Sequence, residues 1–174
     1  MIKEKWDILD SEGRPTGKTA LRGFNFLKQG EYHLVVHIWI ISSDGRFLIQ
    51  RRSDSKKLMP GEWAATGGAA IAGEDSFVAA KRELFEELSI KSDKNTLKKI
   101  LRVKRRNSLL DIWVTVCNTP AEDLILQQSE VAEAKWVEKS ELENMIENGE
   151  FHNYGKEYFN AVFEKIEKFK GAYV

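Results

Sequence analysis

Three glutamates crowd one short stretch of the chain, where their like charges should repel. Glu83, Glu86 and Glu87 stand at positions i, i+3 and i+4, which share one face of an α-helix. Each like-charge pair at i,i+4 destabilises an isolated helix by roughly 0.2–0.5 kcal/mol, and Arg82 offsets only part of that repulsion. A hard divalent cation would remove it, and oxygen ligands alone favour Mg²⁺ or Mn²⁺ over Zn²⁺. Because Mg²⁺ usually joins a few carboxylates to substrate phosphates, the stretch predicts phosphate chemistry.

The alternative interpretation is a solvated acidic helix face, which is the commoner role of three glutamates on a random helix. The surrounding spacing decides against it. Five residues separate Gly68 from Glu74, and seven separate Glu74 from Arg82, which opens the run Arg-Glu-Leu-x-Glu-Glu. Six fixed residues at ~6% usage each would match this pattern by chance in about one window in 10⁷.

The pattern resembles the Nudix box, G-x5-E-x7-R-E-U-x-E-E-x-G-U, in which U is aliphatic. Leu84 and Ile90 fit aliphatic positions, whereas Ser89 replaces the glycine near the end of the box. A glycine after a helix normally serves a left-handed C-terminal cap, where a residue with a Cβ is penalised by roughly 1 kcal/mol. The departure affects the expected loop geometry but removes no metal ligand.

The resemblance implies an α/β fold, the Nudix α/β/α sandwich with a mixed β-sheet and a loop–helix–loop motif. It implies a single domain over residues 1–174, with the box at 68–90. Glu74 and Arg82 would hold the loop–helix–loop together. The residues implied to bind Mg²⁺ or Mn²⁺ and to act in catalysis are Glu83, Glu86 and Glu87, with the backbone carbonyl of Gly68 nearby.

In this family, water attacks a phosphorus atom of a diphosphate that is joined to another group, often in a nucleoside diphosphate derivative. The ions neutralise phosphate charge and lower the pKa of the bound water, and a carboxylate outside the box can act as the base. Two candidates for that base are Asp111, near the start of an apolar segment, and Glu130, just before the predicted strand over 131–138. The sequence does not choose between them.

The elements around the glutamates must hold their helix against a sheet. Between Asp75 and Leu88, apolar residues recur at helical spacing, which predicts a helix with one buried face. Residues 32–42 are rich in β-branched and aromatic side chains, as in a buried central strand, and a turn leads from them into a strand over 46–52. Further predicted elements are an N-terminal strand and hairpin, a strand pair around 107–108, a short helix opened by a Ser140–Glu143 capping box and a helix over 154–170.

Composition bounds the partners and the compartment. Of 174 residues, 42% are hydrophobic and 31% charged, and Lys plus Arg equal Asp plus Glu at 27 each, so no overall basic field indicates a nucleic-acid or membrane partner. Six of the ten residues 97–106 are Lys or Arg, but they alternate like an exposed strand face. The single cysteine, Cys117, excludes an internal disulfide framework and a CxxC metal site. With no signal peptide or transmembrane run, the sequence predicts a cytoplasmic protein.

The resemblance extends beyond the box. The segments WDILDSEGRPTG, YHLVVHIWI and QRRSDSKKLMPGEW are similar to segments of isopentenyl-diphosphate isomerases and of their hydrolase-like relatives. The isomerases bind the substrate diphosphate through an arginine and a lysine at the positions of Arg52 and Lys56. Both residue types suit phosphate contacts. The alternative is that both are solvated charges at a strand end.

The isomerase interpretation fails on specific residues. That chemistry uses a cysteine and a histidine metal ligand just before the box, where this chain has AATGGAA, and Cys117 lies on a distant predicted strand. His33 matches one isomerase ligand position, but the partner position falls near Phe26, which cannot bind a metal. We therefore expect His33 and His37 to be packed or hydrogen-bonded strand residues. The sequences of the isomerases also depart from the REUxEE pattern, which is intact in this chain. This difference favours a hydrolase.

Two hypotheses follow for a small-molecule diphosphate partner. The first is a Mg²⁺-dependent Nudix hydrolase acting on a nucleoside diphosphate derivative or a related small diphosphate, and the second is a module that senses a diphosphate without turnover. The complete carboxylate set favours the first, and an isomerase is third. The C-terminal helix leaves room for a homodimer interface. Aromatic residues that could stack on a base, although core positions are commoner for them, are Trp39, Trp63, Trp113, Phe151 and Tyr154.

Overall fold

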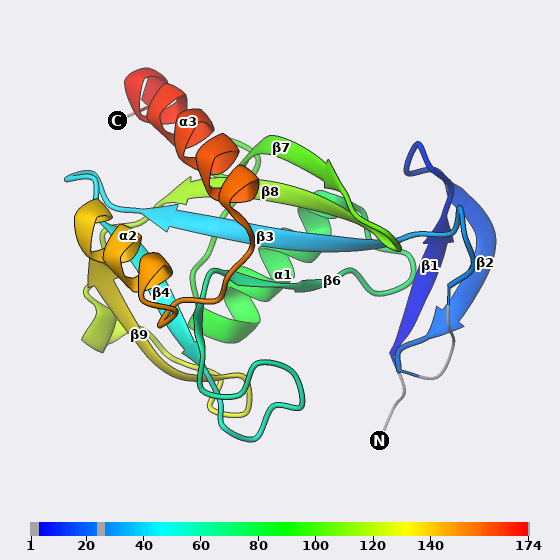
Figure 1. Cartoon of the computed structure of the whole chain (residues 1–174), viewed down its shortest axis with the longest axis horizontal. Coiled ribbons are helices and arrows are strands. Elements are labelled where there is room, and N and C mark those ends of the chain that lie inside the picture. The colour runs from blue at the N-terminus through cyan, green and yellow to red at the C-terminus, as the bar shows by residue number, and fades with distance from the viewer. Residues whose placement is uncertain (1–3, 24–26, 174) are drawn as a thin grey trace.

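A computed structural model of the chain describes residues 4–23 and 27–173 (Figure 1). The strands are β1 (Lys5–Leu9), β2 (Pro15–Leu21), β3 (His33–Ile41), β4 (Phe47–Arg52), β5 (Trp63–Ala64), β6 (Thr66–Ala69), β7 (Lys98–Lys104), β8 (Ser108–Val116) and β9 (Val131–Val137). The helices are α1 (Ser76–Leu88), α2 (Lys139–Glu147) and α3 (Lys156–Tyr173), with a 3₁₀ turn, η1 (Ala121–Asp123).

β3 is the central strand of a seven-stranded mixed sheet, which has the order β5-β4-β3-β8-β7 with β6 beside β3 and β9 beside β4. It runs parallel to β8 and antiparallel to β4 and β6. Val36, Ile38 and Ile40 pack into the core beneath α1, whereas Trp39 and Ile41 pack into the core beneath α2 and α3. α1 therefore covers one face of the sheet and α2 and α3 cover the other (Figure 1), which confirms the predicted α/β/α sandwich.

The sheet splits beside β3, and the split positions the site. β3 pairs with β4 only at Ile40↔Leu48 and Ile41↔Phe47, after which the two strands diverge. After β4, the polypeptide forms β5, which pairs with β4, and then β6, which pairs with β3. A helix that lies over this split can therefore place side chains against both halves of the sheet.

The β1–β2 hairpin forms a separate two-stranded sheet at one end of the molecule (Figure 1). It joins the main body through a bridge between Leu9 and Tyr32 and through Trp6, whose ring stacks on His33 at 4.0 Å. The predicted N-terminal hairpin is thus confirmed. Phe26, the position compared above with an isomerase ligand, lies outside the described residues.

The predicted capping box of α2 is wrong. The helix begins at Lys139, and Glu138 is its N-cap without a side-chain hydrogen bond. β9 ends at Val137, so the chain enters the helix directly from the strand and passes through Ser140 in helical conformation. Both Glu138 and Ser140 are exposed, so water can satisfy the first N–H groups and no side-chain cap is needed.

α1 ends in a cap that explains the departure at Ser89. Asp75 caps the start of the helix, because its carboxylate accepts a hydrogen bond from the N–H of Val78 at 2.8 Å. At the other end, Ser89 has a φ of 55° and its N–H donates to the carbonyl of Phe85. Ser89 therefore adopts the left-handed conformation for which the box normally provides glycine.

We predict that Ser89→Gly stabilises the fold slightly, by less than about 1 kcal/mol, and leaves turnover intact. The change relieves left-handed strain of roughly 1 kcal/mol, but removes a 3.1 Å hydrogen bond from Oγ to the carbonyl of Ile125. Urea unfolding measures the net effect. Ser129→Gly, at an exposed turn position without a positive φ, is the control and should be destabilising. A large loss of turnover in Ser89→Gly would contradict the prediction.

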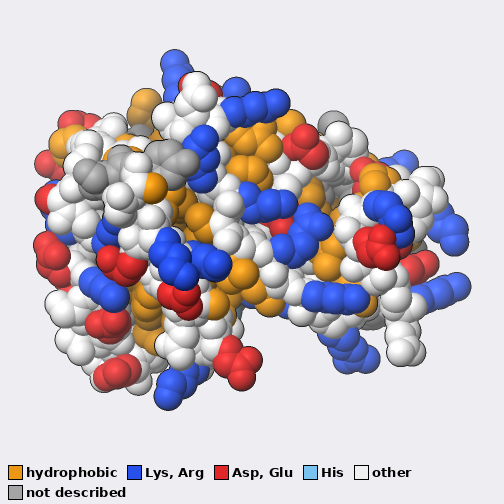
Figure 2. All heavy atoms as spheres, turned by 90° about the horizontal axis from the view of Figure 1, so that it is seen from above, with side chains coloured by type: hydrophobic (Ala, Val, Ile, Leu, Met, Phe, Trp, Pro, Cys, Tyr) orange, Lys and Arg blue, Asp and Glu red, His pale blue; other side chains and the backbone are white. Residues whose placement is uncertain are grey.

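β7 forms one edge of the sheet and carries the basic segment noted in the sequence. Figure 2 looks onto the side of the molecule that carries β7 and α3, and there the Lys and Arg side chains lie among Asp and Glu side chains. Charged side chains on an edge strand discourage pairing with another strand. No helix in the described part of the chain is long and apolar enough to cross a membrane.

Candidate functional site

The three glutamates on the box helix differ in exposure, and only Glu87 is fully buried. The side chain of Glu83 is 12% exposed and Glu87 is 3% exposed, whereas the side chain of Glu86 is 48% exposed. Burial first, and the negative charge of Glu83 second, raise the pKa of Glu87 to about 8. Burial also raises the pKa of Glu83. Two carboxylates so close together and so little solvated are unfavourable when both are charged, and a bound cation would stabilise their charged forms.

Arg82 ties the start of the box to its helix. Its guanidinium donates to both carboxylate oxygens of Glu74, at 2.7 and 2.9 Å, and to the carbonyl of Ala69 at 3.2 Å. Its Nη1 donates to Glu83 at 2.9 Å and to Glu86 at 3.1 Å. A bidentate Arg–carboxylate pair of this kind fixes the geometry of both groups. The structure thus places Glu74 and Arg82 in the framework of the loop and the helix.

Gly68 lies directly against the carboxylate of Glu83. A Cβ atom built on Gly68 would stand 2.2 Å from Oε1 of Glu83, so any side chain at this position would displace the carboxylate. β6 therefore places backbone atoms of Gly68 against Glu83. The Gly68 carbonyl would have to lie near this carboxylate to serve as a metal ligand.

The donor set fits a hard divalent ion, because it consists of carboxylate oxygens, those of Glu87 being buried. Within residues 4–23 and 27–173, no three acidic, His or Cys side chains are already arranged to hold an ion. Two of the carboxylates, those of Glu83 and Glu86, accept hydrogen bonds from Nη1 of Arg82.

Glu130 and the two predicted phosphate-binding residues lie beside the glutamates. Lys56 Nζ forms an ion pair with Glu130, and the negative charge of Glu130 contributes to the raised pKa values of Glu83 and Glu87. Arg52 is close enough to lower the pKa of Glu87 in part. Glu130 and Arg52 therefore lie within electrostatic range of Glu87, and Lys56 is held by Glu130, although Glu130 is distant in sequence from the other two.

Asp111 is not at this centre, and the prediction that it might serve as the base is corrected. It is fully buried and paired bidentately with Arg102, at 2.6 and 2.8 Å. It also interacts with Ser76 at the start of α1, and eleven residues of helix from there to Glu87 span roughly 16 Å. The Arg102 pair holds the pKa of Asp111 below its usual value, which makes the carboxylate a poor base.

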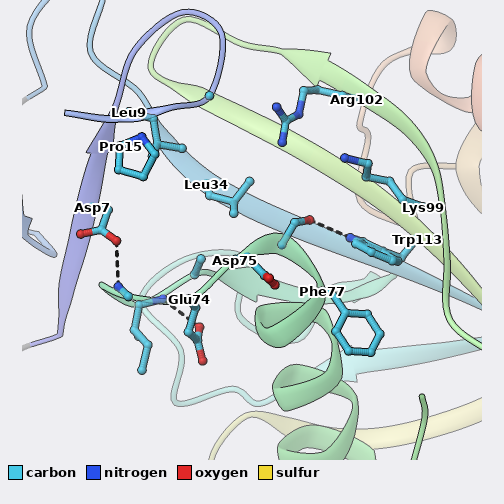
Figure 3. Close-up of a pocket in the computed structure, with 15 residues that line it drawn as sticks. Asp7, Leu9, Pro15, Leu34, Glu74, Asp75, Phe77, Lys99, Arg102 and Trp113 are labelled. Carbon is cyan, nitrogen blue, oxygen red and sulfur yellow. Dashed lines mark hydrogen bonds between the residues drawn. The ribbon is translucent and has the colours of Figure 1, made fainter. Parts of the chain in front are cut away.

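A separate cavity of about 540 Å³ lies between the β1–β2 hairpin, the loop before α1 and the β7–β8 pair (Figure 3). Lys99 and Arg102 extend toward it from β7, and the indole N–H of Trp113 donates to Ser76 Oγ at 2.9 Å. Glu74 lines this cavity, but Glu83, Glu86 and Glu87 do not. It is therefore distinct from the carboxylate centre.

Three of the five aromatic candidates are buried. Trp39 and Phe151 are each 1% exposed and lie in the core, whereas Trp113, 8% exposed, lines the separate cavity. Trp63 is partly buried beneath Lys135 Nζ, 4.9 Å from its ring. Tyr154 lies within electrostatic range of the site, because the charges of both Arg52 and Glu87 influence its pKa, which burial raises to about 12.

Two residues that sequence reasoning missed are Gln50 and Thr66, which are buried beside Glu87. The signal for Gln50 was available. It follows Leu48 by two positions on a strand, so it occupies a core-facing position that should carry an apolar side chain. Thr66 gave no comparable signal, because threonine is common in strands.

His33 and His37 are strand residues, as expected. His37 Nδ1 lies 2.8 Å from the hydroxyl of Tyr158, and His33 stacks on Trp6. Burial lowers the pKa of His37 to about 3, with smaller contributions from Arg105 and His152. His37 is therefore neutral in the folded protein throughout the physiological range.

We predict that acid destabilises the fold partly through His37. Its pKa is near 6.5 when unfolded and about 3 when folded, so the stability that neutral His37 contributes is complete above pH 6.5 and is lost as the pH falls toward 3. Between pH 7 and pH 5 this loss amounts to about 2 kcal/mol. Urea unfolding of His37→Gln should show a pH dependence flatter by that amount. An unchanged slope in His37→Gln would contradict the prediction.

Comparison with known proteins identifies the family. A sequence profile described as the NUDIX domain matches residues 31–157. The chain belongs to the NUDIX family. It is similar to the Nudix hydrolase lmo0368 of Listeria monocytogenes, with 39% identity over 87% of this chain and 89% of that protein. The crystal structure of DR0079 from Deinococcus radiodurans, at 24% identity, shares the fold with a TM-score of 0.73, over 85% of this chain and 91% of that one.

As a Nudix hydrolase, the protein belongs to a group of enzymes that generally use divalent metal ions. An isopentenyl-diphosphate Δ-isomerase of Kocuria rhizophila is a more distant relative, with 27% identity over 85% of both chains. Here a Cβ at Gly67 would lie 2.2 Å from the carbonyl oxygen of Val36. This backbone therefore leaves no room for a side chain at position 67.

Proposed function

We propose that this Nudix enzyme is a Mg²⁺-dependent hydrolase that cleaves the diphosphate linkage of a nucleoside diphosphate derivative or a related small diphosphate. The observation that carries the proposal is one acidic centre flanked by two cations. Glu87 is buried and the side chain of Glu83 is 12% exposed. The charge of Glu130 acts on both carboxylates and that of Arg52 on Glu87, and Lys56 is paired with Glu130. Negative ligands for an ion and positive groups for phosphate oxygens are what diphosphate hydrolysis requires.

Each residue has a role in this proposal. Glu83, Glu86 and Glu87, with the Gly68 carbonyl, would hold Mg²⁺ or Mn²⁺, which when bound supplies charge neutralisation and a lower pKa for the attacking water. Arg52 binds phosphate oxygens through its planar guanidinium and Lys56 through its ammonium group.

Glu130 is the proposed base, and its partner in the free protein is Lys56. A substrate diphosphate would compete for the Lys56 ammonium group and leave Glu130 without its cation. The carboxylates of Glu83 and Glu87 are close enough to interact with Glu130. Glu130 would then be free to accept a proton from the attacking water as a general base.

The proposed partner is a small diphosphate in the cytoplasm. The equal numbers of acidic and basic residues and the single free cysteine, Cys117, are compatible with that compartment. Neither nucleic acid nor membrane is part of the proposal.

The test is Mg²⁺-dependent turnover of nucleoside di- and triphosphates, nucleotide sugars, dinucleotides and isopentenyl diphosphate. Mass spectrometry identifies the products, and ¹⁸O-labelled water reports which phosphorus is attacked. Glu86→Gln is the control variant for metal binding. Labelled phosphate products that disappear in Glu86→Gln would support the hydrolase, and a shifted double bond without cleavage would indicate isomerisation. Ligand binding with no turnover of any substrate would replace the hydrolase by a sensing module.

A further inference from the structure

A short chain of buried hydrogen bonds ends on Glu87. Thr66 Oγ1 donates to Gln50 Oε1 at 2.9 Å, and Gln50 Nε2 donates to Glu87 Oε2 at 2.8 Å. Gln50 and Thr66 are each 1% exposed and Glu87 is 3% exposed. Both bonds therefore form where water cannot compete, and each is correspondingly strong.

The chain of bonds crosses the split in the sheet. Gln50 lies on β4, opposite Ala64 of β5, and Thr66 lies on β6, opposite Ile38 of β3. Glu87 belongs to α1, which covers this face. Two hydrogen bonds thus join the two halves of the sheet to the helix at one point.

Thr66 determines which way the Gln50 amide points. The amide carries an oxygen that accepts and a nitrogen that donates. Because the Thr66 hydroxyl donates to the oxygen, the nitrogen is directed at the Glu87 carboxylate. The reverse orientation would set the amide oxygen against a carboxylate oxygen, and neither could donate a proton to the other.

Packing alone does not account for a glutamine at position 50. Leu48, two residues earlier, faces the same core and is 2% exposed. Burial of an amide is unfavourable unless its hydrogen-bonding groups find partners, so an apolar side chain would suit packing better. The glutamine makes sense as a group that holds Glu87.

We propose that Gln50 and Thr66 are positioning residues for Glu87. The Gln50 amide donates to Oε2 of Glu87, which leaves Oε1 of Glu87 to contact the ion. Thr66 keeps the Gln50 amide in the donating orientation. The inference rests on the proposed function, in which Glu87 is a metal ligand. Loss of a group that orients a metal ligand typically weakens metal affinity or activity by about 10–100-fold.

The test measures Mn²⁺ affinity, which needs no knowledge of the substrate. Free Mn²⁺ is titrated by electron paramagnetic resonance in wild type, Thr66→Val, Thr66→Ser and Gln50→Leu. We expect about tenfold weaker Mn²⁺ binding in Thr66→Val and in Gln50→Leu, with Thr66→Ser within about twofold of wild type. Thr115→Val is the matched control, because Thr115 is a threonine 2% exposed on β8, and it should leave Mn²⁺ binding unchanged.

A metal-independent measurement tests the geometry itself. In ¹H–¹⁵N spectra of the metal-free protein, the Gln50 side-chain amide should be protected from exchange. Its shifts should move in Thr66→Val but not in Thr115→Val. Unfolding curves establish that each variant is folded at the temperature of the titration.

The outcomes separate the two levels of inference. No Mn²⁺ binding by folded wild type would overturn the proposed metal site and the positioning role with it. Mn²⁺ binding that is equal in wild type, Thr66→Val and Gln50→Leu would overturn the positioning role alone. Failure of Thr66→Ser to restore affinity would overturn the assignment of the hydroxyl hydrogen bond.

Discussion

Glu87→Gln should lose at least about 100-fold in turnover while making the metal-free protein more stable. The substitution keeps the size of the side chain and removes its charge, and removal of a group that binds the ion in the reacting complex is worth several kcal/mol of barrier. The stability gain has a separate origin. Glu87 is 3% exposed, and burial with the charge of Glu83 raises its pKa to about 8.

The sign of this stability effect follows from proton linkage. The pKa of Glu87 is higher in the folded than in the unfolded protein, so its contribution to stability is complete below pH 4.5 and is lost as the pH rises toward 8. At pH 7 a neutral glutamine should therefore stabilise the protein by about 1–3 kcal/mol in EDTA. In the proposed function Glu87 is a metal ligand, so Mg²⁺ should raise the stability of wild type more than that of the variant.

Urea unfolding with and without Mg²⁺, together with kcat on the substrate found by the panel, measures both effects. Gln128→Glu is a useful control, because position 128 is exposed and a charge there should change neither quantity. Wild-type turnover in Glu87→Gln would place Glu87 outside the metal site. A less stable variant in EDTA would contradict the buried-charge argument.

Arg82→Met should destabilise the fold by about 3–5 kcal/mol, the range found when one partner of a buried ion pair is removed. The side chain of Glu74 is 10% exposed and that of Glu83 is 12% exposed, so each carboxylate would lose its guanidinium without gaining much water. The carbonyl of Ala69 would lose a donor as well. Methionine conserves most of the aliphatic length, so the effect reports the lost contacts.

The matched control is Lys81→Met, which removes a positive charge from an exposed position of the same helix and should change stability by less than about 0.5 kcal/mol. Arg82→Lys should recover only part of the loss, because an ammonium group cannot donate to both Glu74 oxygens in the planar geometry of arginine. Unfolding midpoints measure the series. An Arg82→Met protein within about 1 kcal/mol of wild type would refute this role.

The elements of the fold were readable because their signals are local. The apolar spacing of α1 and the β-branched density of β3 depend on residues close together in sequence, and both elements lie where they were predicted. Even Ser89 was interpretable, since the left-handed cap is a property of a single residue. The capping box at Ser140 failed because a side-chain cap can be dispensed with where water satisfies the helix N-terminus.

The choice between Asp111 and Glu130 needed the tertiary structure. Both are acids beside predicted strands, and nothing in their neighbouring residues says which end of α1 each one meets. The strand order places Asp111 beside Arg102 on β7, and the pairing of β9 with β4 brings Glu130 to Lys56. Strand order is set by contacts between distant segments, so only the folded chain decides it.

The sequence by itself determined the family, the sandwich and the helix that carries the glutamates, because a fixed spacing on a helix fixes which side chains share a face. Only the tertiary structure decided which carboxylates are buried, because burial depends on every element that packs around a residue. Glu83 and Glu87 are enclosed and Glu86 is half exposed, although the three are near neighbours on one helix. The buried link from Thr66 through Gln50 to Glu87 likewise exists only because the sheet splits beneath α1.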